Sequence, residues 1–503
     1  MTKTKQTKVN FYTNILALLA NIVVGIYYTP YLLDNLGLLA YGVLPLALII
    51  NQYISVVTQT LTHSYTRFYS VALQKEDYEA ASKNISTSFI VTILIALCIL
   101  PIAWLLVNNV DRVFNIPSDL LLSAQSLFSY TILSFICSLF SSLFNVTLYA
   151  INKLDLLNVI KIVRAILKLV LVIILFNIYR IDVSLVGIAN LISEIVILLF
   201  SIYLFLKFKP IAVRVSIKLF DISVLYAILG MSVWVLIQVC GDTLIYRTDN
   251  LILNAFWDVK ASGALGAISE IGSYVTVIVS VVGSLFGPLI LISYSKGEHD
   301  EVKSLLVTQS TIVGSLSAIL SGVISGFAVV ILDVWLGNDM GQYSWWLVLK
   351  MMVLPYFAAG GIMAFVYRAW NRVKFPAIGT ILIGFADVIV LIFICKLIKP
   401  ASPLIILVVS AGFAFIQCFL LNAIAVSKLY PEVRSAFIKI FYRITLVYFI
   451  SYLCSKVFAN ILTVSSIWIL AFSLLFIGVI LLLIVYFMIY NKEERSSFVK
   501  ILK

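Results

Sequence analysis

Residues 155–176 read DLLNVIKIVRAILKLVLVIILF, an apolar run that nevertheless carries three cations. After its first turn, the stretch is long and hydrophobic enough to cross a bilayer as a helix, which takes about 20 apolar residues. Lys161, Arg164 and Lys168 lie inside it. What these cations do depends on whether the rest of the chain also belongs in a membrane.

The composition of the whole chain is that of a membrane protein. Of its 503 residues, 62% are hydrophobic and only 12% are charged, whereas soluble chains are roughly 45–50% apolar and about 25% charged. The basic start at Lys3, Lys5 and Lys8 runs directly into an apolar stretch with no small-residue cleavage site, so we expect the first helix to be retained. We therefore predict an all-α, polytopic membrane protein.

Fourteen segments are predicted to span the membrane. Their ranges are 10–33, 42–64, 87–108, 121–149, 156–177, 183–206, 223–248, 265–292, 306–331, 345–368, 377–398, 403–426, 441–459 and 466–489. With both termini in the cytoplasm, 24 Lys and Arg residues fall on cytoplasmic segments and 6 on outer segments, as the positive-inside rule requires. The net charge of +12 is thus explained by topology and attraction to anionic lipid, not by binding of nucleic acid.

The two halves of the chain resemble each other. IYYTPYLLDNLGLLAYG starts at Ile26 and IYRTDNLILNAFWDVKASG starts at Ile245. Parallel repeats are typical of transporters in which two lobes move about a shared central site. We predict an N-terminal lobe of six helices at 1–206, a basic cytoplasmic linker at 207–222, a C-terminal lobe of six helices at 223–430, and two further helices with a basic cytoplasmic tail at 431–503.

Five cations inside the predicted spans are the strongest functional signal: Lys161, Arg164, Lys168, Arg247 and Lys350. The first three fall within about 60° of one another on a helix with 3.6 residues per turn. Each would cost roughly 2.5–3.5 kcal/mol if it faced lipid, so we expect them to face protein or water. A cationic stripe in a hydrated cavity is suited to a diphosphate group, because Arg binds two phosphate oxygens at once and Lys supplies point charges.

Structural pairing is the alternative interpretation of these cations. The spans also hold the acids Glu194, Asp242, Glu270 and Asp387, and Asp249 directly follows the span at 223–248. Arg247 and Asp249 are predicted to form a local ion pair, and Lys161 is close enough to the cytoplasmic end of its helix to reach the membrane surface. We predict that Asp242, Glu194, Glu270 and Asp387 bind a coupling ion, H⁺ or Na⁺, with Asp242 the first choice.

Polar side chains recur on one face of other spans, which indicates a polar cavity. Asn14, Asn21 and Tyr28 recur every seven residues, Gln52 and Gln59 share a face, and Gln238 lies one turn before Asp242. We predict that these amides and the phenol contact sugar hydroxyls and ring faces. The alternative is hydrogen bonding between helices, worth about 0.6 kcal/mol per contact.

Catalytic motifs are not recognisable in the sequence. We find no nucleotide-binding loop, metal-ligand cluster or nucleophile–base pair, and the six cysteines have no paired spacing. The longest outer loops, at 109–120, 249–264 and 332–344, are too short to fold into a catalytic site. We therefore expect no enzymatic activity and no resident cofactor.

Several short stretches resemble those of bacterial polysaccharide flippases. They are LGLLAYG (36–42), YAINKLDLLN (149–158), YSKGEHDE (294–301), WLGNDM (335–340) and WNRVKFPAIGTI (370–381). Their order and spacing are similar to those of the polysaccharide transporter family, within the multidrug/oligosaccharidyl-lipid/polysaccharide (MOP) exporter superfamily. The resemblance implies two six-helix lobes around a central polar cavity, followed by two extra helices, in the bacterial cytoplasmic membrane.

The same resemblance implies a flippase that works by alternating access. Its substrate would be an undecaprenyl-pyrophosphate-linked oligosaccharide repeat unit for capsule, O-antigen or another surface polysaccharide. Its partners would be membrane lipid, glycosyltransferases and a polysaccharide polymerase. Two alternatives remain: a flippase for lipid II or a teichoic-type precursor, and a cation-coupled drug or metabolite antiporter. Lipid II flippases carry arginines in helices 1, 2 and 8 that this chain lacks, and antiporters often have a carboxylate in helix 1, which is also missing here.

Overall fold

Helices make up the folded chain in this computed structural model. The structure describes residues 3–284, 286–337, 339–370, 372–398, 402–462, 466–492 and 494–496, and no strand occurs among them. The chain divides into two compact units. Unit 1 comprises Met1–Thr243 and Asn254–Gly263, and unit 2 comprises Leu244–Leu253 and Ala264–Lys503.

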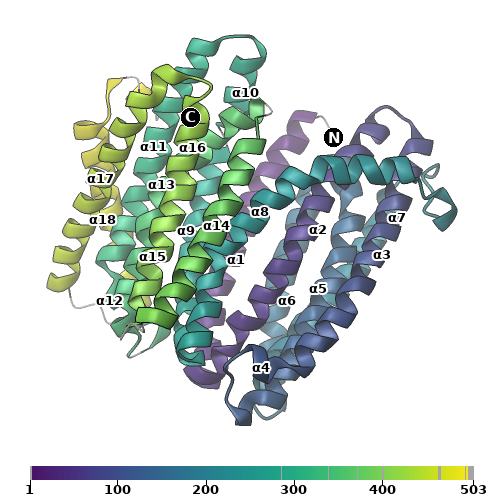
Figure 1. Ribbon diagram of the computed structural model, residues 1–503, viewed down its shortest axis with the longest axis horizontal. Helices are drawn as coiled ribbons and strands as arrows, with labels where there is room; N and C mark the ends of the chain where they lie inside the picture. The colour runs from purple at the N-terminus through teal and green to yellow at the C-terminus, as the bar shows by residue number, and fades with distance from the viewer. Residues whose placement is uncertain are drawn as a thin grey trace. The chain divides into compact units, whose positions relative to one another are not determined.

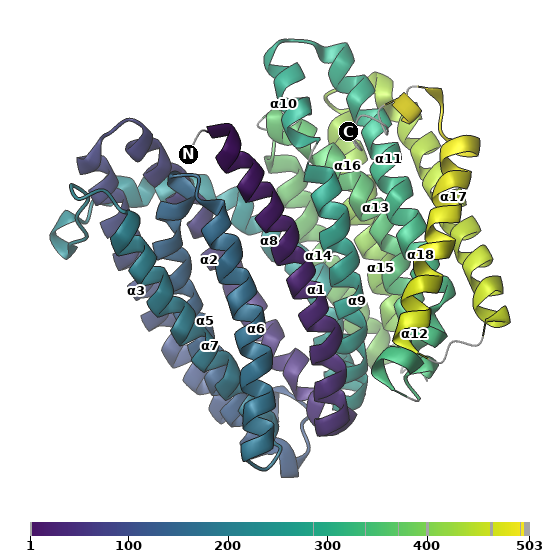
Figure 2. The same ribbon diagram turned by 180° about the vertical axis from the view of Figure 1, so that it is seen from behind.

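Unit 1 is a bundle of long helices. Its helices are α1 (Lys3–Tyr41), α2 (Val43–Gln74), α3 (Tyr78–Asn108), the short α4 (Val110–Val113), α5 (Leu121–Ala150), α6 (Leu154–Ile178), α7 (Val183–Phe208) and the first part of α8 (Ile222–Phe256). α5 packs along α7 and α2, while α1 packs along α6 (Figures 1 and 2). Two breaks in the first helices need glycine: Gly37 has φ +73°, and a Cβ on Gly42 would lie 2.2 Å from the Val259 carbonyl oxygen.

Unit 2 begins within α8 and contains the remaining helices. They are most of α9 (Val259–Ser284), then α10 (Gly287–Ser295), α11 (His299–Gly326), α12 (Ala328–Leu336), α13 (Ser344–Ala369), α14 (Lys374–Phe393), α15 (Leu404–Phe415), α16 (Asn422–Ser427), α17 (Arg434–Ile461) and α18 (Ile467–Ile484). α11 is its central helix, because it packs against both α13 and α17.

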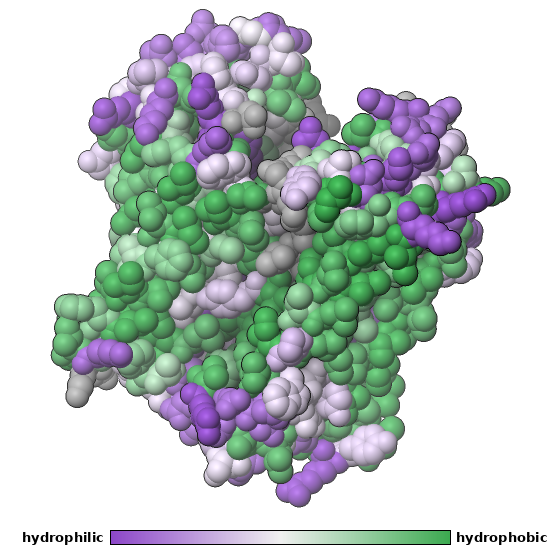
Figure 3. All heavy atoms as spheres, turned by 45° about the vertical axis from the view of Figure 1, so that its right-hand side comes forward, coloured by the Kyte–Doolittle hydropathy of each residue, from purple (hydrophilic) through white to green (hydrophobic). Residues whose placement is uncertain are grey.

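The chain is a multi-pass membrane protein. Eleven helices among the described residues are long and apolar enough to cross a membrane, or twelve if α8, which bends by 45°, counts as one span. On the face shown in Figure 3, hydrophobic side chains cover the middle of the helices and hydrophilic ones gather at their ends. Each of the fourteen predicted segments lies on helical structure. The count of fourteen spans stays a prediction, since α2 and α6 do not meet the same test.

Small residues allow the closest helix packing in unit 2. A Cβ on Gly322 of α11 would lie 2.6 Å from Ser451 Cβ and 2.8 Å from the Tyr448 carbonyl oxygen of α17, and one on Gly326 would lie 2.5 Å from Ser455 Cβ. Such contacts replace the hydrophobic effect, which does not drive helices together in lipid. We infer that this seam fixes α17 against α11.

We expect Gly322→Ala to lower the stability of the protein, because the added methyl group overlaps the α17 backbone. Overpacking of this kind costs roughly 1–3 kcal/mol. Gly412→Ala is the matched control, since nothing lies within 4 Å of its added Cβ. Thermal unfolding in detergent, followed by scanning fluorimetry, measures both. Equal Tm values for the two variants would contradict the proposed seam.

Candidate functional site

The three cations of the opening stretch lie on α6, which packs against α1 and α7. A helix of 25 residues spans about 37 Å at 1.5 Å per residue, and α6 has that length. Lys161 lies in its first third, and Lys168 lies just past its middle. The side chains of Arg164 and Lys168 are half-buried, whereas Lys161 is exposed.

Arg164 forms an ion pair with an acid of the neighbouring helix. Its Nε lies 2.8 Å from Glu194 Oε1 on α7, and the two side chains are 37% and 15% exposed. The Ser193 hydroxyl, one residue earlier, donates to the Arg164 carbonyl oxygen at 3.5 Å. The predicted coupling acid Glu194 is therefore the partner of a predicted substrate ligand.

Lys168 lies against an aromatic ring of α1. Its Nζ is 4.5 Å from the centroid of the Tyr28 ring, a distance at which the ring face attracts a cation. Glu194 also attracts Lys168 electrostatically. Lys161 donates to Asn158 Oδ1 at 3.5 Å and forms no ion pair in the part of the chain that the structure describes. Arg164 and Lys168 thus lie where α6 contacts α7 and α1, whereas the hydrogen bond of Lys161 is to its own helix.

The predicted polar residues of α1 and α2 have mixed surroundings. Asn14 and Asn21 are exposed, and Asn21 Nδ2 donates to the Ala17 carbonyl oxygen of its own helix at 2.7 Å. Gln52 is half-buried, and the side chain of Gln59 lies outside the described residues. Of those predicted polar side chains that the structure describes, Tyr28 is the one given in contact with a cation of α6. Gln238 and Asp242, on the part of α8 that belongs to unit 1, are both half-buried.

Unit 2 contains a separate charged cluster. Lys350 of α13 pairs with Asp249 of α8, whose side chain is 2% exposed. Asp387 of α14 is 1% exposed and interacts electrostatically with both. Its Oδ1 has no hydrogen-bond partner among the described residues.

This cluster corrects a prediction. The expected pair of Arg247 with Asp249 was wrong: Asp249 turns to Lys350, because residues two apart on a helix point to different faces. Lys350, predicted to bind substrate, is thereby engaged by a carboxylate. Arg247 and Glu270 are half-buried.

A polar network that the sequence analysis missed ties the start of α1 to the α5–α6 turn. Asn10 Nδ2 donates to the Asn152 carbonyl oxygen at 3.0 Å, and its Oδ1 accepts the Asp155 N–H at 3.0 Å. Gln6 Nε2 donates to Asp155 Oδ1 at 2.8 Å. The signal was the run of polar residues Gln6, Asn10 and Thr13, which are one helical turn apart and precede the predicted cavity face.

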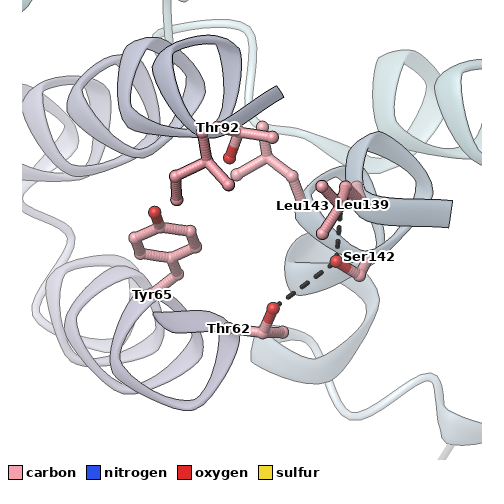
Figure 4. A pocket seen from close by; sticks show the side chains of 7 residues that line it. Thr62, Tyr65, Thr92, Leu139, Ser142 and Leu143 are labelled. Carbon is pink, nitrogen blue, oxygen red and sulfur yellow. Dashed lines mark hydrogen bonds between the residues drawn. The ribbon is translucent and has the colours of Figure 1, made fainter. Parts of the chain in front are cut away.

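A small polar cavity lies inside unit 1, between α2, α3 and α5. Its volume is about 10 Å³, room for about one water molecule. Figure 4 shows the Tyr65 hydroxyl pointing toward Thr92, while Thr62 and Ser142 share a hydrogen bond of 3.4 Å. The cavity is far too small for a sugar. Among the described residues, no group of three His, Cys, Asp or Glu side chains could hold a metal ion.

Comparison with curated proteins finds a bacterial relative. The chain is 26% identical over 391 residues to the "Uncharacterized membrane protein EpsK" of Bacillus subtilis (strain 168). The aligned region covers 76% of this chain and 75% of the relative. No model of a protein family matches the chain.

Solved structures show the fold. A multidrug resistance MATE family transporter of the MOP superfamily, in an inward-facing conformation, matches with a TM-score of 0.70 at 13% identity, over 84% of this chain and 98% of that one. The lipid II flippase MurJ, in an inward closed conformation, matches with a TM-score of 0.67 at 16% identity, over 99% and 100%. These likenesses confirm the predicted resemblance to the MOP superfamily at the level of the fold.

We expect Lys350→Met to destabilise the protein, because it leaves Asp249 buried without its cation. Removing one partner of a buried ion pair costs roughly 3–5 kcal/mol. The double variant Lys350→Met/Asp249→Asn should recover most of the loss. Lys456→Met, at an exposed lysine, is the control for losing one charge. Unfolding in detergent is the measurement, and a double variant as unstable as the single one would contradict the pairing.

Proposed function

We propose that this protein is a flippase that moves an undecaprenyl-pyrophosphate-linked oligosaccharide from the inner to the outer leaflet by alternating access. The observation that carries the proposal is the cationic stripe of α6, where Lys161, Arg164 and Lys168 are accompanied by one acid, Glu194. A positive excess within a membrane helix is energetically costly, so its presence indicates a functional role. A diphosphate head group supplies the matching negative charge.

The likeness to known transporters supports transport over catalysis. The structural neighbours are, by their printed descriptions, a lipid II flippase and multidrug transporters. We infer that this chain shares transport with them. Among transported substrates, a lipid-linked anion fits the stripe better than a cationic drug, because like charges repel in a medium of low dielectric.

Each contact of the stripe suggests a role in binding the diphosphate. Arg164 keeps one edge of its guanidinium group on Glu194 through Nε, which leaves its two terminal nitrogens to bind phosphate oxygens in the bidentate manner of arginine. Tyr28 holds Lys168 by its ring face. Lys161, exposed near the start of α6, would meet the head group first as it enters from the cytoplasmic side.

We also propose that transport is coupled to H⁺ or Na⁺. Of the predicted coupling acids, Asp387 has the strongest structural support, since it is 1% exposed and lies near the Asp249–Lys350 pair. Two carboxylates beside one ammonium leave a negative excess that a bound cation would balance. The sugar class, the polymerase and the glycosyltransferases remain part of the proposal that rests on sequence resemblance alone.

We expect Arg164→Gln and Lys168→Gln each to lower export of surface polysaccharide, because each removes a charged contact with phosphate. Such contacts are worth roughly 1.5–3 kcal/mol, about a 10- to 100-fold loss of affinity. Export is measured in cells as surface polysaccharide per molecule of transporter in the membrane. The control is Lys396→Gln, at an exposed lysine just after the C-terminal end of α14.

A second variant separates binding from stability. Arg164→Gln alone leaves Glu194 unpaired, whereas Arg164→Gln/Glu194→Gln removes both charges and should restore the Tm. If the double variant is stable and fails to export while Glu194→Gln alone still exports, Arg164 acts on the substrate. If it regains export, Arg164 serves only to neutralise Glu194, and the proposed role of Arg164 fails.

We expect Asp387→Asn to abolish the dependence of transport on an ion gradient, because the amide cannot bind H⁺ or Na⁺ as the carboxylate does. The readout is uptake of a labelled lipid-linked oligosaccharide in vesicles with and without imposed H⁺ and Na⁺ gradients. Asp242→Asn and Glu270→Gln are tested in parallel. A full gradient response from Asp387→Asn would assign coupling to another acid.

A further inference from the structure

Residues 207–221, which comprise the last two residues of α7 and the link to α8, are basic and carry exposed apolar side chains. It contains four basic residues and one acid, Asp221. Ile211 is 98% exposed and Ile217 is 75% exposed. Figure 1 shows the segment in teal beyond the end of α7. Exposed apolar side chains beside basic ones are suited to the boundary between lipid head groups and acyl chains.

Buried packing and hydrogen bonds hold this segment against unit 1 while its two isoleucines stay exposed. Val213 is fully buried in a core cluster of unit 1, where it joins Tyr69 and Ile228. Three backbone N–H groups donate to hydroxyls of α3: Arg214 to Ser82 at 3.0 Å, Ser216 to Ser86 at 3.1 Å and Asp221 to Thr87 at 3.0 Å. The backbone cannot turn Ile217 inward without breaking the bonds on either side of it.

The hydrogen bonds to α3 also define the depth of the segment. They run from Ser82 to Thr87, five residues or about 7.5 Å along the helix axis. The apolar run of α3 begins directly after them, at Phe89. The segment therefore lies beside the level at which the start of α3 passes from polar surroundings into hydrocarbon.

The charges of the segment are those of a surface that binds anions. Lys207, Arg214 and Lys218 are exposed. The Asp221 carboxylate accepts the N–H and the hydroxyl of Ser223, at 2.8 Å and 2.5 Å, so its charge is engaged within the chain. Exposed cations that alternate with exposed apolar residues match the phosphates and the acyl boundary of an anionic leaflet.

We propose that residues 207–221 bind anionic phospholipid head groups of the leaflet that faces the start of α3. Ile211 and Ile217 insert into the boundary between head groups and acyl chains, and Arg214 and Lys218 contact the phosphates. The occupant is lipid rather than a protein, because the apolar side chains are separated by cations instead of forming one continuous patch. The proposal is independent of which substrate the protein transports.

Lipid-dependent stability of the full chain tests the charged contacts. We expect added phosphatidylglycerol to raise the Tm of the purified protein by several degrees more than phosphatidylcholine does, as a ligand of the folded state must. Arg214→Gln/Lys218→Gln should lose most of that difference, and Arg434→Gln/Lys439→Gln, two exposed basic residues of α17, should keep it. An unchanged difference in the first double variant would overturn the proposal.

Insertion is tested with an environment-sensitive fluorophore on a variant whose six cysteines are replaced. The fluorophore at Ile211→Cys should report an apolar environment in phosphatidylglycerol vesicles. The same fluorophore at Lys75→Cys, an exposed position before α3, should report an aqueous environment. Equal aqueous spectra would overturn insertion. An apolar signal at residue 211 that disappears when the protein is diluted among more vesicles would overturn it too, by indicating contact with a second copy.

Discussion

The ion pair of Arg164 with Glu194 is the interaction that allows a cationic helix to lie in unit 1. A guanidinium group in a membrane needs a partner or water, and α7 supplies the partner at 2.8 Å. The pairing is incomplete for the stripe as a whole, because Glu194 interacts with Arg164 and Lys168, while Lys161 forms no ion pair among the described residues. An anion bound at α6 would balance this excess, as we propose for the diphosphate head group.

The two units have opposite charge imbalances. Unit 1 has a positive excess on α6, whereas unit 2 has two carboxylates, Asp249 and Asp387, around the single ammonium of Lys350. We therefore propose separate sites for the anionic substrate and the coupling cation in the same chain.

Much of the fold could be predicted from the sequence, because apolar runs and positive charges are local signals. The helices lie where the apolar stretches are, including α6 despite its cations. The partners of the charges were harder to predict. Glu194 is 30 residues from Arg164 and Lys350 is 101 residues from Asp249, so pairing depends on which helices pack together. The expected Arg247–Asp249 pair failed because sequence proximity was mistaken for a shared helix face. The hydroxyls of α3 that fix residues 207–221 carry no signal either, since serines near a helix start are also common caps.

The charge of the transported molecule is the most direct test of the account. Purified protein in vesicles would be given a fluorescent prenyl-diphosphate oligosaccharide and, separately, a cationic dye, with leaflet accessibility and dye uptake as the readouts. The account predicts that the diphosphate lipid changes leaflet without chemical modification, and that the dye is not transported. Transport of the dye without movement of the diphosphate lipid would contradict the central claim that the cations of α6 bind an anionic head group.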